Sequence, residues 1–220
     1  MLTEIGQAER RSGRGEGSVT LLPVTKGHPP ELAREAIALG LTTLGENYLQ
    51  ECIAKDRVLQ AAGATVIWHL LGHLQRNKAR RAAELFQMVE SLDSLEIAQL
   101  LSRARVGQAK LRVLCEVELT GLPRRSGFDP SLLEKQITQL MELEGIEVEG
   151  IMTLADPADP ERAFAKGREL LERLRLLSGH QLPALSMGMS GDFQEAILAG
   201  STQVRIGSLL FGSRPAGAAG

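Results

Sequence analysis

The chain has 220 residues, a formal net charge of −2 and an aromatic content of 3%. This length suits one sizeable hydrophobic core, while the charge balance and the few aromatic side chains argue against binding to a nucleic-acid backbone or to stacked single-stranded bases. No apolar run reaches the length that spans a membrane, and the N-terminus lacks the charged and apolar regions of a signal peptide.

The two cysteines, Cys52 and Cys115, lie far apart and outside any CxxC motif. Such spacing does not indicate a disulfide framework, so we interpret both as small buried hydrophobic residues. Free thiols are typical of a reducing compartment, which predicts a cytoplasmic location.

Strands and helices alternate along nearly the whole chain. An N-terminal helix and a glycine-rich loop are expected over residues 1–18. After them, apolar and β-branched runs predict strands, and periodic segments bounded by capping residues, proline or glycine predict helices. The expected strands are 19–25, 41–45, 65–71, 86–91, 111–119, 146–154, 184–187 and 202–206. The expected helices are 31–39, 46–62, 74–83, 94–105, 131–142, 160–177 and 191–199, and Ser131 and Glu134 form a plausible capping box.

About eight strand–helix units predict one α/β domain over residues 1–220. Parallel neighbouring strands need a crossover between them, which alternation supplies. Eight units favour a closed (β/α)8 TIM barrel over an open doubly wound sheet, and no G-x-G-x-x-G motif follows the first strand to support dinucleotide binding. Residues 215–220, rich in glycine and alanine, are expected to form a flexible tail.

The last two expected strands end in sequences typical of an anion site. LSMGMSGD at 185–192 and VRIGS at 204–208 each run from apolar residues into glycine and hydroxyl-bearing residues. Backbone N–H groups at such positions bind anions, and loops after strands seven and eight of a barrel often hold a phosphate. Ser186, Gly207 and Ser208 are therefore candidate phosphate ligands, whereas Ser190 is interpreted as the N-cap of the following helix.

Lys26 closes the first expected strand, at the mouth of the barrel. Burial at this position would lower the pKa of its amine, and a neutral lysine amine forms a Schiff base with an aldehyde. The alternative is a surface lysine that extends into solvent. Combined with a phosphate site across the barrel mouth, Lys26 points to a molecule with both an aldehyde and a phosphate, which describes pyridoxal 5′-phosphate (PLP).

Two further residues could contact such a molecule. Arg205 is interpreted as a phosphate ligand or as the partner of the pyridine nitrogen, with an ion pair to a neighbouring acid as the alternative. As a permanent cation it cannot accept a proton, so it would keep that nitrogen unprotonated. Asn47 could hydrogen-bond a ring hydroxyl or cap the second helix, and both interpretations remain open.

His69 and His73 are four residues apart, a spacing that would suit a metal on a helix. Residues 65–71 predict a strand instead, and no cysteine or carboxylate cluster completes a site, so no metal is expected. The basic run at 76–81 and the loop at 124–127 are interpreted as solvated surface, with an anion- or RNA-attracting patch as the alternative.

Several segments of the chain resemble the YggS/PROSC family, the pyridoxal phosphate homeostasis proteins. They are VTK at 24–26 followed by Pro29, GENYLQE at 45–51, WHLLGHLQRNK at 68–78, SLDS at 91–94, GIMT at 150–153, LSMGMS at 185–190 and VRIGS at 204–208 with FG at 211–212. The resemblance extends from about residue 10 to residue 214. The family usually has serine at the place of Thr25, a Thr-Lys pair at 27–28 and threonine at the place of Ser208, and these departures keep the lysine and the hydroxyl.

This resemblance implies a single-domain PLP-binding barrel of the alanine-racemase type, in the fold-type III class. It implies that the cofactor PLP is bound covalently to Lys26 as an internal aldimine. It also implies phosphate contacts from Ser186, Gly207 and Ser208, a position for Arg205 facing the pyridine nitrogen and one for Asn47 beside the cofactor. The implied function is to hold PLP for intracellular vitamin B6 homeostasis, without robust catalysis, and to supply PLP-dependent apoenzymes.

The alternative function is an amino-acid racemase that acts through PLP. A two-base racemase needs a second acid or base on the far face of the substrate, usually a tyrosine from an extra domain. The single tyrosine, Tyr48, lies at a helix start, and His73 is a conceivable second base. We expect a monomer that has neither a membrane nor a nucleic acid as a partner.

Overall fold

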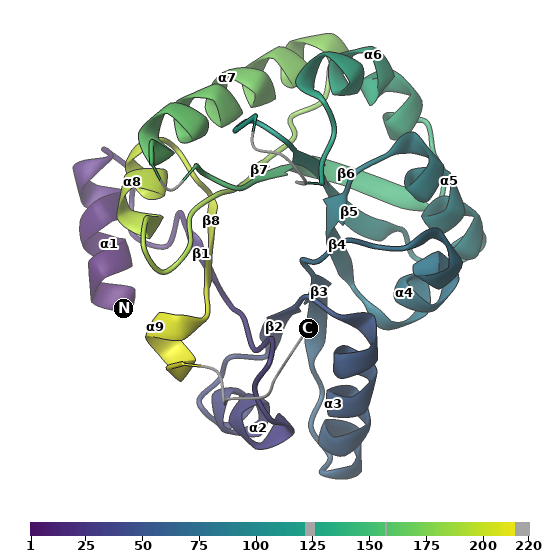
Figure 1. The fold of residues 1–220 in the computed structure, drawn as a ribbon, viewed down its shortest axis with the longest axis vertical. Helices are drawn as coiled ribbons and strands as arrows, with labels where there is room; N and C mark the ends of the chain where they lie inside the picture. Colours follow the sequence, from purple (N-terminus) through teal and green to yellow (C-terminus); the bar gives the residue numbers. More distant parts are fainter. Residues whose placement is uncertain (122–125, 157, 214–220) are drawn as a thin grey trace.

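The computed structural model describes residues 1–121, 126–156 and 158–213 and shows a ring of eight parallel strands surrounded by helices (Figure 1). The strands are β1 (Thr20–Pro23), β2 (Thr43–Glu46), β3 (Ile67–Leu70), β4 (Met88–Leu92), β5 (Leu111–Val117), β6 (Ile146–Thr153), β7 (Ala184–Ser186) and β8 (Gln203–Ile206). The helices are α1 (Leu2–Arg11), α2 (Pro30–Ala38), α3 (Leu49–Ala61), α4 (Ala79–Leu85), α5 (Leu95–Ala104), α6 (Pro130–Met141), α7 (Pro160–Ser178), α8 (Phe193–Leu198) and α9 (Ser208–Phe211), with a short 3-10 turn η1 (Arg76–Lys78). The predicted (β/α)8 barrel is confirmed.

The strand order is β1-β8-β7-β6-β5-β4-β3-β2, so the ring has to close between β1 and β2. It does so just beyond β1, where Val24 bridges to Gly45 and the Thr25 N–H donates to the Gly45 carbonyl oxygen at 3.0 Å. Gly45 permits this closure, because a Cβ there would lie 3.3 Å from Val24 Cγ2. All parallel strands therefore end at one mouth, where barrel enzymes place their ligand sites.

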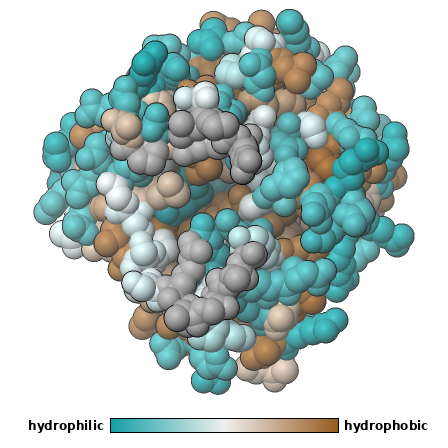
Figure 2. Space-filling view, viewed as in Figure 1, coloured by the Kyte–Doolittle hydropathy of each residue, from teal (hydrophilic) through white to brown (hydrophobic). Residues whose placement is uncertain are grey.

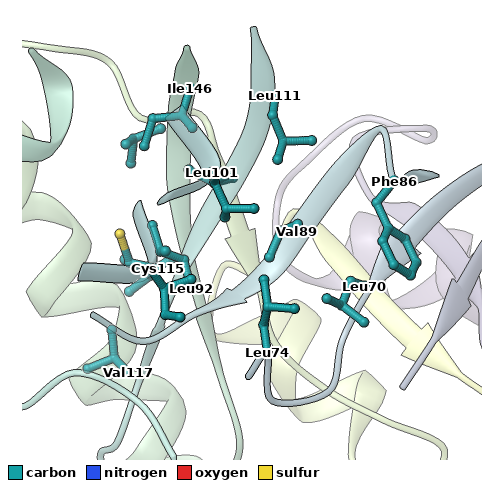
Figure 3. Close-up of a cluster of buried hydrophobic side chains, with 14 of the residues drawn as sticks. Leu70, Leu74, Phe86, Val89, Leu92, Leu101, Leu111, Cys115, Val117 and Ile146 are labelled. Atoms are coloured by element: carbon teal, nitrogen blue, oxygen red, sulfur yellow. The ribbon is translucent and has the colours of Figure 1, made fainter. Parts of the chain in front are cut away.

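The hydrophobic core has two layers. The larger layer lies between the strands and the outer helices, where Leu101 of α5 packs against strand residues such as Val89 and Leu111 (Figure 3). The smaller layer fills the barrel interior with Met88, Leu114 and Met152. Since filled barrel interiors are packed cores and not pores, the ligand space must lie above this inner layer.

The N-terminal helix α1 packs outside the barrel beside α8 (Figure 1). A separate cluster of buried side chains joins it to β8 and α8, and the Arg14 guanidinium fixes the segment that follows by donating to the carbonyl oxygens of Ser201 and Ile197 at 2.7 and 2.6 Å. In the three described segments no helix has the length and apolar character that a membrane crossing requires.

Three local predictions needed correction. The helix expected at 74–83 is a 3-10 turn followed by α4. The capping box at Ser131 is wrong: Pro130 begins α6 one residue earlier, and the Asp129 carboxylate accepts from the N–H groups of Ser131 and Leu132 at 2.9 and 3.1 Å. The four-residue helix α9 was missed, since so short a segment carries no periodicity.

Other surface and core interpretations can be compared directly. Cys52 and Cys115 are both free and buried, as expected. Arg76, Arg80 and Arg81 lie exposed on the surface and form ion pairs with glutamates. Arg124, Arg125 and the expected tail at 215–220 lie outside the described residues.

Candidate functional site

A cavity of about 430 Å³ opens at the C-terminal ends of the strands. In the space-filling view the centre of this face is hollowed (Figure 2). The volume is within the usual range for a small-molecule site, roughly 300–1,000 Å³. The walls combine polar and apolar residues, namely Val24, Lys26, His28, Asn47, Leu71, Met152, Leu154, Met189, Ser190, Gly191, Arg205, Gly207, Ser208, Gly212 and Ser213.

The pairing of β1 with β8 brings the two ends of the chain to this cavity. Leu22 lies opposite Arg205 in the register of these strands, and the Val24 N–H donates to the Ile206 carbonyl oxygen at 2.8 Å. Lys26 follows β1 by three residues, while Gly207 directly follows β8. A lysine and a glycine-hydroxyl loop, far apart in the sequence, therefore line the same cavity.

Five of the six residues expected at the site line the cavity: Lys26, Asn47, Arg205, Gly207 and Ser208. Asn47 does not cap the helix expected at 46–62, because this helix is α3 and Tyr48 occupies its N-cap position. Gly207 permits close chain approach, since a Cβ there would lie 3.2 Å from the Val24 carbonyl oxygen. The local sequence found these positions because each lies within three residues of the end of an apolar strand.

Ser190 is a cavity residue that the sequence interpretation assigned to another role. The N-cap of α8 is Asp192, whose Oδ1 accepts from the Met189 N–H at 2.6 Å. The interpretation of Ser190 as the N-cap is therefore wrong. Its Oγ accepts from the Leu209 N–H at 3.4 Å and it faces the cavity, so it adds a hydroxyl to the side formed by Ser208.

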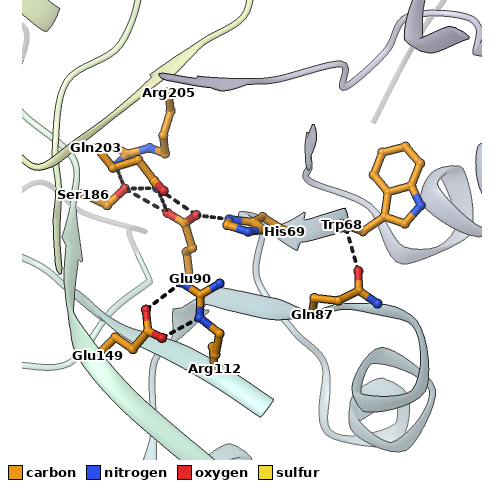
Figure 4. Close-up of polar contacts among 9 residues, drawn as sticks. All are labelled: Trp68, His69, Gln87, Glu90, Arg112, Glu149, Ser186, Gln203 and Arg205. Carbon is orange, nitrogen blue, oxygen red and sulfur yellow. Dashed lines mark hydrogen bonds and ion pairs between the residues drawn. The ribbon is translucent and has the colours of Figure 1, made fainter. Parts of the chain in front are cut away.

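Ser186 lies at a different level, fully buried inside the barrel. Its hydroxyl donates to Glu90 Oε2 at 2.8 Å and accepts from Arg205 Nη1 at 2.7 Å and from Gln203 Nε2 at 3.0 Å (Figure 4). It is not among the cavity-lining residues. The structure thus brings Ser186 to Arg205 and Glu90, whereas the sequence analysis expected it to contact a phosphate.

Arg205 is a fixed cation in the cavity wall. It is 5% exposed, and its Nη2 donates to the Thr153 carbonyl oxygen at 2.9 Å in addition to the bond with Ser186. Burial lowers the pKa of Arg205, and attraction to Glu90 acts in the opposite direction. Since a guanidinium remains protonated in proteins, the cavity wall has a permanent positive charge. Hydrogen bonds to Ser186 and Thr153 fix its position.

Glu90 supplies the matching negative charge inside the barrel. Burial alone would raise the pKa of Glu90, but hydrogen bonds from His69 and Gln203 and the charge of Arg205 together lower it. His69 Nδ1 lies 2.8 Å from Glu90 Oε1, and Gln203 Nε2 donates to both carboxylate oxygens. The carboxylate is therefore ionised and fully hydrogen-bonded, as a buried charge needs to be.

The two histidines singled out by their spacing belong to separate pairs. His69 contacts Glu90 inside the barrel, whereas His73 Nδ1 lies 2.8 Å from Asp93 Oδ2 on a half-exposed surface. Among residues 1–121, 126–156 and 158–213, no group of three or more histidine, cysteine or acidic side chains is placed to hold a metal ion.

Glu116 predicts a pH-dependent stability effect. It lies in β5 opposite Met152, is 4% exposed and accepts from Ser126 Oγ at 3.0 Å, while its Oε2 has no partner among the described residues. Burial, reinforced by the Asp93 charge, raises the pKa of Glu116. A raised folded-state pKa contributes stability below the unfolded value, near ~4.3, and this contribution is lost as the pH rises through the folded value.

We therefore expect Glu116→Gln to raise the thermal unfolding midpoint at pH 7 and to change it little at pH 4. Thermal unfolding followed by circular dichroism at both pH values measures this. The same shift at both pH values would contradict the assignment, because the substitution would then act through packing alone.

Comparisons with known proteins agree with this fold. Residues 8–215 match the family model described as alanine racemase, N-terminal domain. The pyridoxal phosphate homeostasis protein of Pseudomonas aeruginosa is 42% identical over 219 residues, covering 97% of this chain and 93% of that protein. The protein of the same name from Aquifex aeolicus is 38% identical over 219 residues, covering 97% and 95%.

Solved structures give the same result. The structure of PipY from Synechococcus elongatus with PLP bound superposes with a TM-score of 0.83 at 37% identity, covering 96% of this chain and 100% of that chain. An alanine racemase from Clostridium difficile has a TM-score of 0.73 at 20% identity, covering 99% of this chain and 57% of that chain, and shares the fold. With a matching family model over most of its length and close relatives over nearly all of it, this chain belongs to the family of pyridoxal phosphate homeostasis proteins.

Proposed function

We propose that this chain binds PLP in the cavity at the barrel mouth and takes part in intracellular PLP homeostasis. The observation that carries the proposal is the placement of Lys26, Arg205 and the hydroxyls of Ser190 and Ser208 around one cavity. The donor set suits the ligand: hydroxyls, glycine backbone and a fixed cation for an anionic phosphate and a ring nitrogen, and a lysine for an aldehyde. PLP-bound PipY, a relative at 37% identity, supports it.

We assign the phosphate to the loops of Ser190, Gly207 and Ser208 and the aldehyde to Lys26. In the covalent step, neutral Lys26 Nζ attacks the aldehyde carbon, a C=N bond forms, and the aldehyde oxygen leaves as water with the two amine protons. Asn47 directly follows β2, which adjoins the Lys26 segment through the bridge between Val24 and Gly45, and is assigned to the ring. Ser186 acts indirectly, because its hydroxyl accepts a hydrogen bond from Arg205 and so helps to position the guanidinium.

Arg205 would affect the electronics of the bound ring. A guanidinium facing the pyridine nitrogen would donate a hydrogen bond to its lone pair and could not accept a proton, so the bound ring would be a weaker electron sink than one paired with a carboxylate. The alternative, an amino-acid racemase, would need His73 as its second base; the Asp93 carboxylate orients this imidazole, but neither residue is among those that line the cavity. Deuterium incorporation at Cα of L-alanine decides between the proposed function and this alternative: exchange at ordinary enzyme turnover would establish the racemase.

The proposal also covers the oligomeric state of the protein, the recipients of PLP and the cellular compartment. We propose a monomer, because the lysine, the cation and the hydroxyls assigned to the ligand all line one cavity of this chain. PLP-dependent apoenzymes are the proposed recipients, because an aldehyde held by an exchangeable C=N bond can pass to another lysine amine. The two buried free cysteines support a reducing compartment such as the cytoplasm.

The test is chemical trapping on the wild-type protein. The protein is titrated with PLP, the C=N bond is reduced with borohydride, and the digested peptides are mapped by mass. We expect a phosphopyridoxyl group on Lys26. The group on any other lysine, or no trapped group at saturating PLP, would overturn the assignment of Lys26.

A further inference from the structure

Three charged side chains lie directly beneath the loop that carries Lys26. Lys55 Nζ of α3 donates to Glu46 Oε1 at 2.5 Å, to Glu51 Oε1 at 2.7 Å and to the Thr25 carbonyl oxygen at 2.6 Å. Lys55 is 2% exposed and Glu46 is fully buried. None of these three charged residues lines the cavity, so their role has to be exerted through the loop.

The same three residues hold the backbone on both sides of Lys26. Before Lys26, the Thr25 carbonyl oxygen accepts from Lys55, and Thr25 Oγ1 donates to Glu46 Oε1 at 2.6 Å. After Lys26, the Gly27 N–H donates to Glu51 Oε1 at 2.6 Å. Gly27 has φ of 71°, a conformation that glycine adopts readily. The direction in which the Lys26 side chain leaves the backbone is thereby fixed.

The contacts also determine which lysine is available as a nucleophile. An ammonium has three N–H donors, and Lys55 uses three acceptors, two of them carboxylate oxygens. Each N–H donor of Lys55 is thus directed at an acceptor, and Lys55 is not among the residues that line the cavity. Its ion pairs with Glu46 and Glu51 keep the Lys55 amine away from a ligand in the cavity.

We propose that Glu46, Glu51 and Lys55 are positioning residues that aim Lys26 into the cavity and restrict aldehyde capture to this one amine. The proposal rests on the proposed function for the identity of the aldehyde. Its physical basis is preorganisation: a reacting group held in its productive direction avoids the loss of conformational freedom when the bond forms. Glu51 is the residue to change, because its side chain is 25% exposed and its loss disturbs the core least.

The experiment compares two ligands on Glu51→Ala. PLP reports phosphate binding plus capture by Lys26, whereas pyridoxine 5′-phosphate, which has no aldehyde, reports phosphate binding alone. We expect the affinity for PLP to fall at least tenfold and the affinity for pyridoxine 5′-phosphate to stay within about twofold. Glu51→Gln, which keeps an oxygen able to accept from Gly27 and Lys55, is expected to restore most of the PLP affinity.

Glu9→Ala is the matched control. Glu9 is 2% exposed and accepts from the Gly17 N–H, Ser18 Oγ and the Val19 N–H, so its loss also removes a buried network, but on the N-terminal side of β1. This variant should lower the unfolding midpoint, and it should not change the affinity for PLP relative to that for pyridoxine 5′-phosphate. If Glu51→Ala weakens both ligands equally, or weakens neither, the positioning role is overturned.

A second measurement needs no PLP and no variant. Acetic anhydride is added to the unliganded wild-type protein, and acetylation at Lys26 and Lys55 is followed by peptide mass. We expect Lys26 to be modified well before Lys55. Equal rates would overturn the restriction to one amine while leaving PLP binding itself intact. By contrast, a wild-type protein that binds PLP without a trapped C=N bond would overturn the Lys26 assignment in the proposed function.

Discussion

Lys26→Ala is expected to abolish the visible absorbance band of the PLP-loaded protein at about 420 nm, and to lower the affinity for PLP at least tenfold, about 1.4 kcal/mol. Lys26 lines the cavity. Lys55 is buried nearby, does not line the cavity and donates to three acceptors. The variant cannot form the C=N bond. The hydroxyls and glycines of the two loops remain, so noncovalent binding of pyridoxine 5′-phosphate should be unchanged.

Spectra and equilibrium titrations of wild type and variant with both ligands measure this effect. Lys110→Ala is the control, because Lys110 is exposed and precedes β5 at the opposite end of the strands from the cavity. It should leave the band and both affinities unchanged. A full-strength band in Lys26→Ala would show that another amine carries the cofactor.

Arg205→Ala is expected to destabilise the fold by about 1–3 kcal/mol, the usual cost of leaving a buried acceptor without its donor. The substitution removes the donor to the Thr153 carbonyl oxygen and takes away a positive charge that lowers the pKa of the fully buried Glu90, which keeps its ion pair with His69. Arg205→Lys should recover part of this loss, because it keeps the charge but cannot donate in the same two fixed directions. PLP binding should weaken in both variants, since each changes the cation in the cavity wall.

Urea unfolding followed by fluorescence measures the loss, because the single tryptophan, Trp68, is 1% exposed in β3 and reports on the barrel. Arg112→Ala is the matched control: Arg112 pairs with Glu149, but its side chain is 47% exposed. Its cost should stay within about 1 kcal/mol. If Arg205→Ala costs no more than this control, the electrostatic link between Arg205 and Glu90 is refuted.

The strands and most of the site could be predicted from local sequence. Lys26, Asn47, Gly207 and Ser208 each lie within a few residues of a strand end, and a barrel brings all strand ends to one mouth. The orientation of individual hydroxyls could not be predicted this way. Ser186 ends β7 and points to Glu90 inside the barrel, whereas Ser190, four residues later, reaches the cavity.

Glu46 shows why the supporting network was missed. The sequence placed it at the start of a helix, but it is the last residue of β2, buried against Lys55 and Thr25. A glutamate followed by polar residues is typical of a helix start, so the local signal favoured exposure. The contact with Lys55 depends on how α3 packs on β2, which no local pattern encodes.

The sequence by itself determined the barrel, through the alternation of apolar strands with helices, and it determined that a lysine and two glycine-hydroxyl loops follow strands whose ends meet at the cavity. The tertiary structure decided which charges hold these groups. Glu90 meets Ser186 across 96 residues of chain, and Lys55 reaches the carbonyl next to Lys26. Such contacts depend on strand register and barrel closure, because a buried charge is stable only where the fold brings its partners within hydrogen-bond distance.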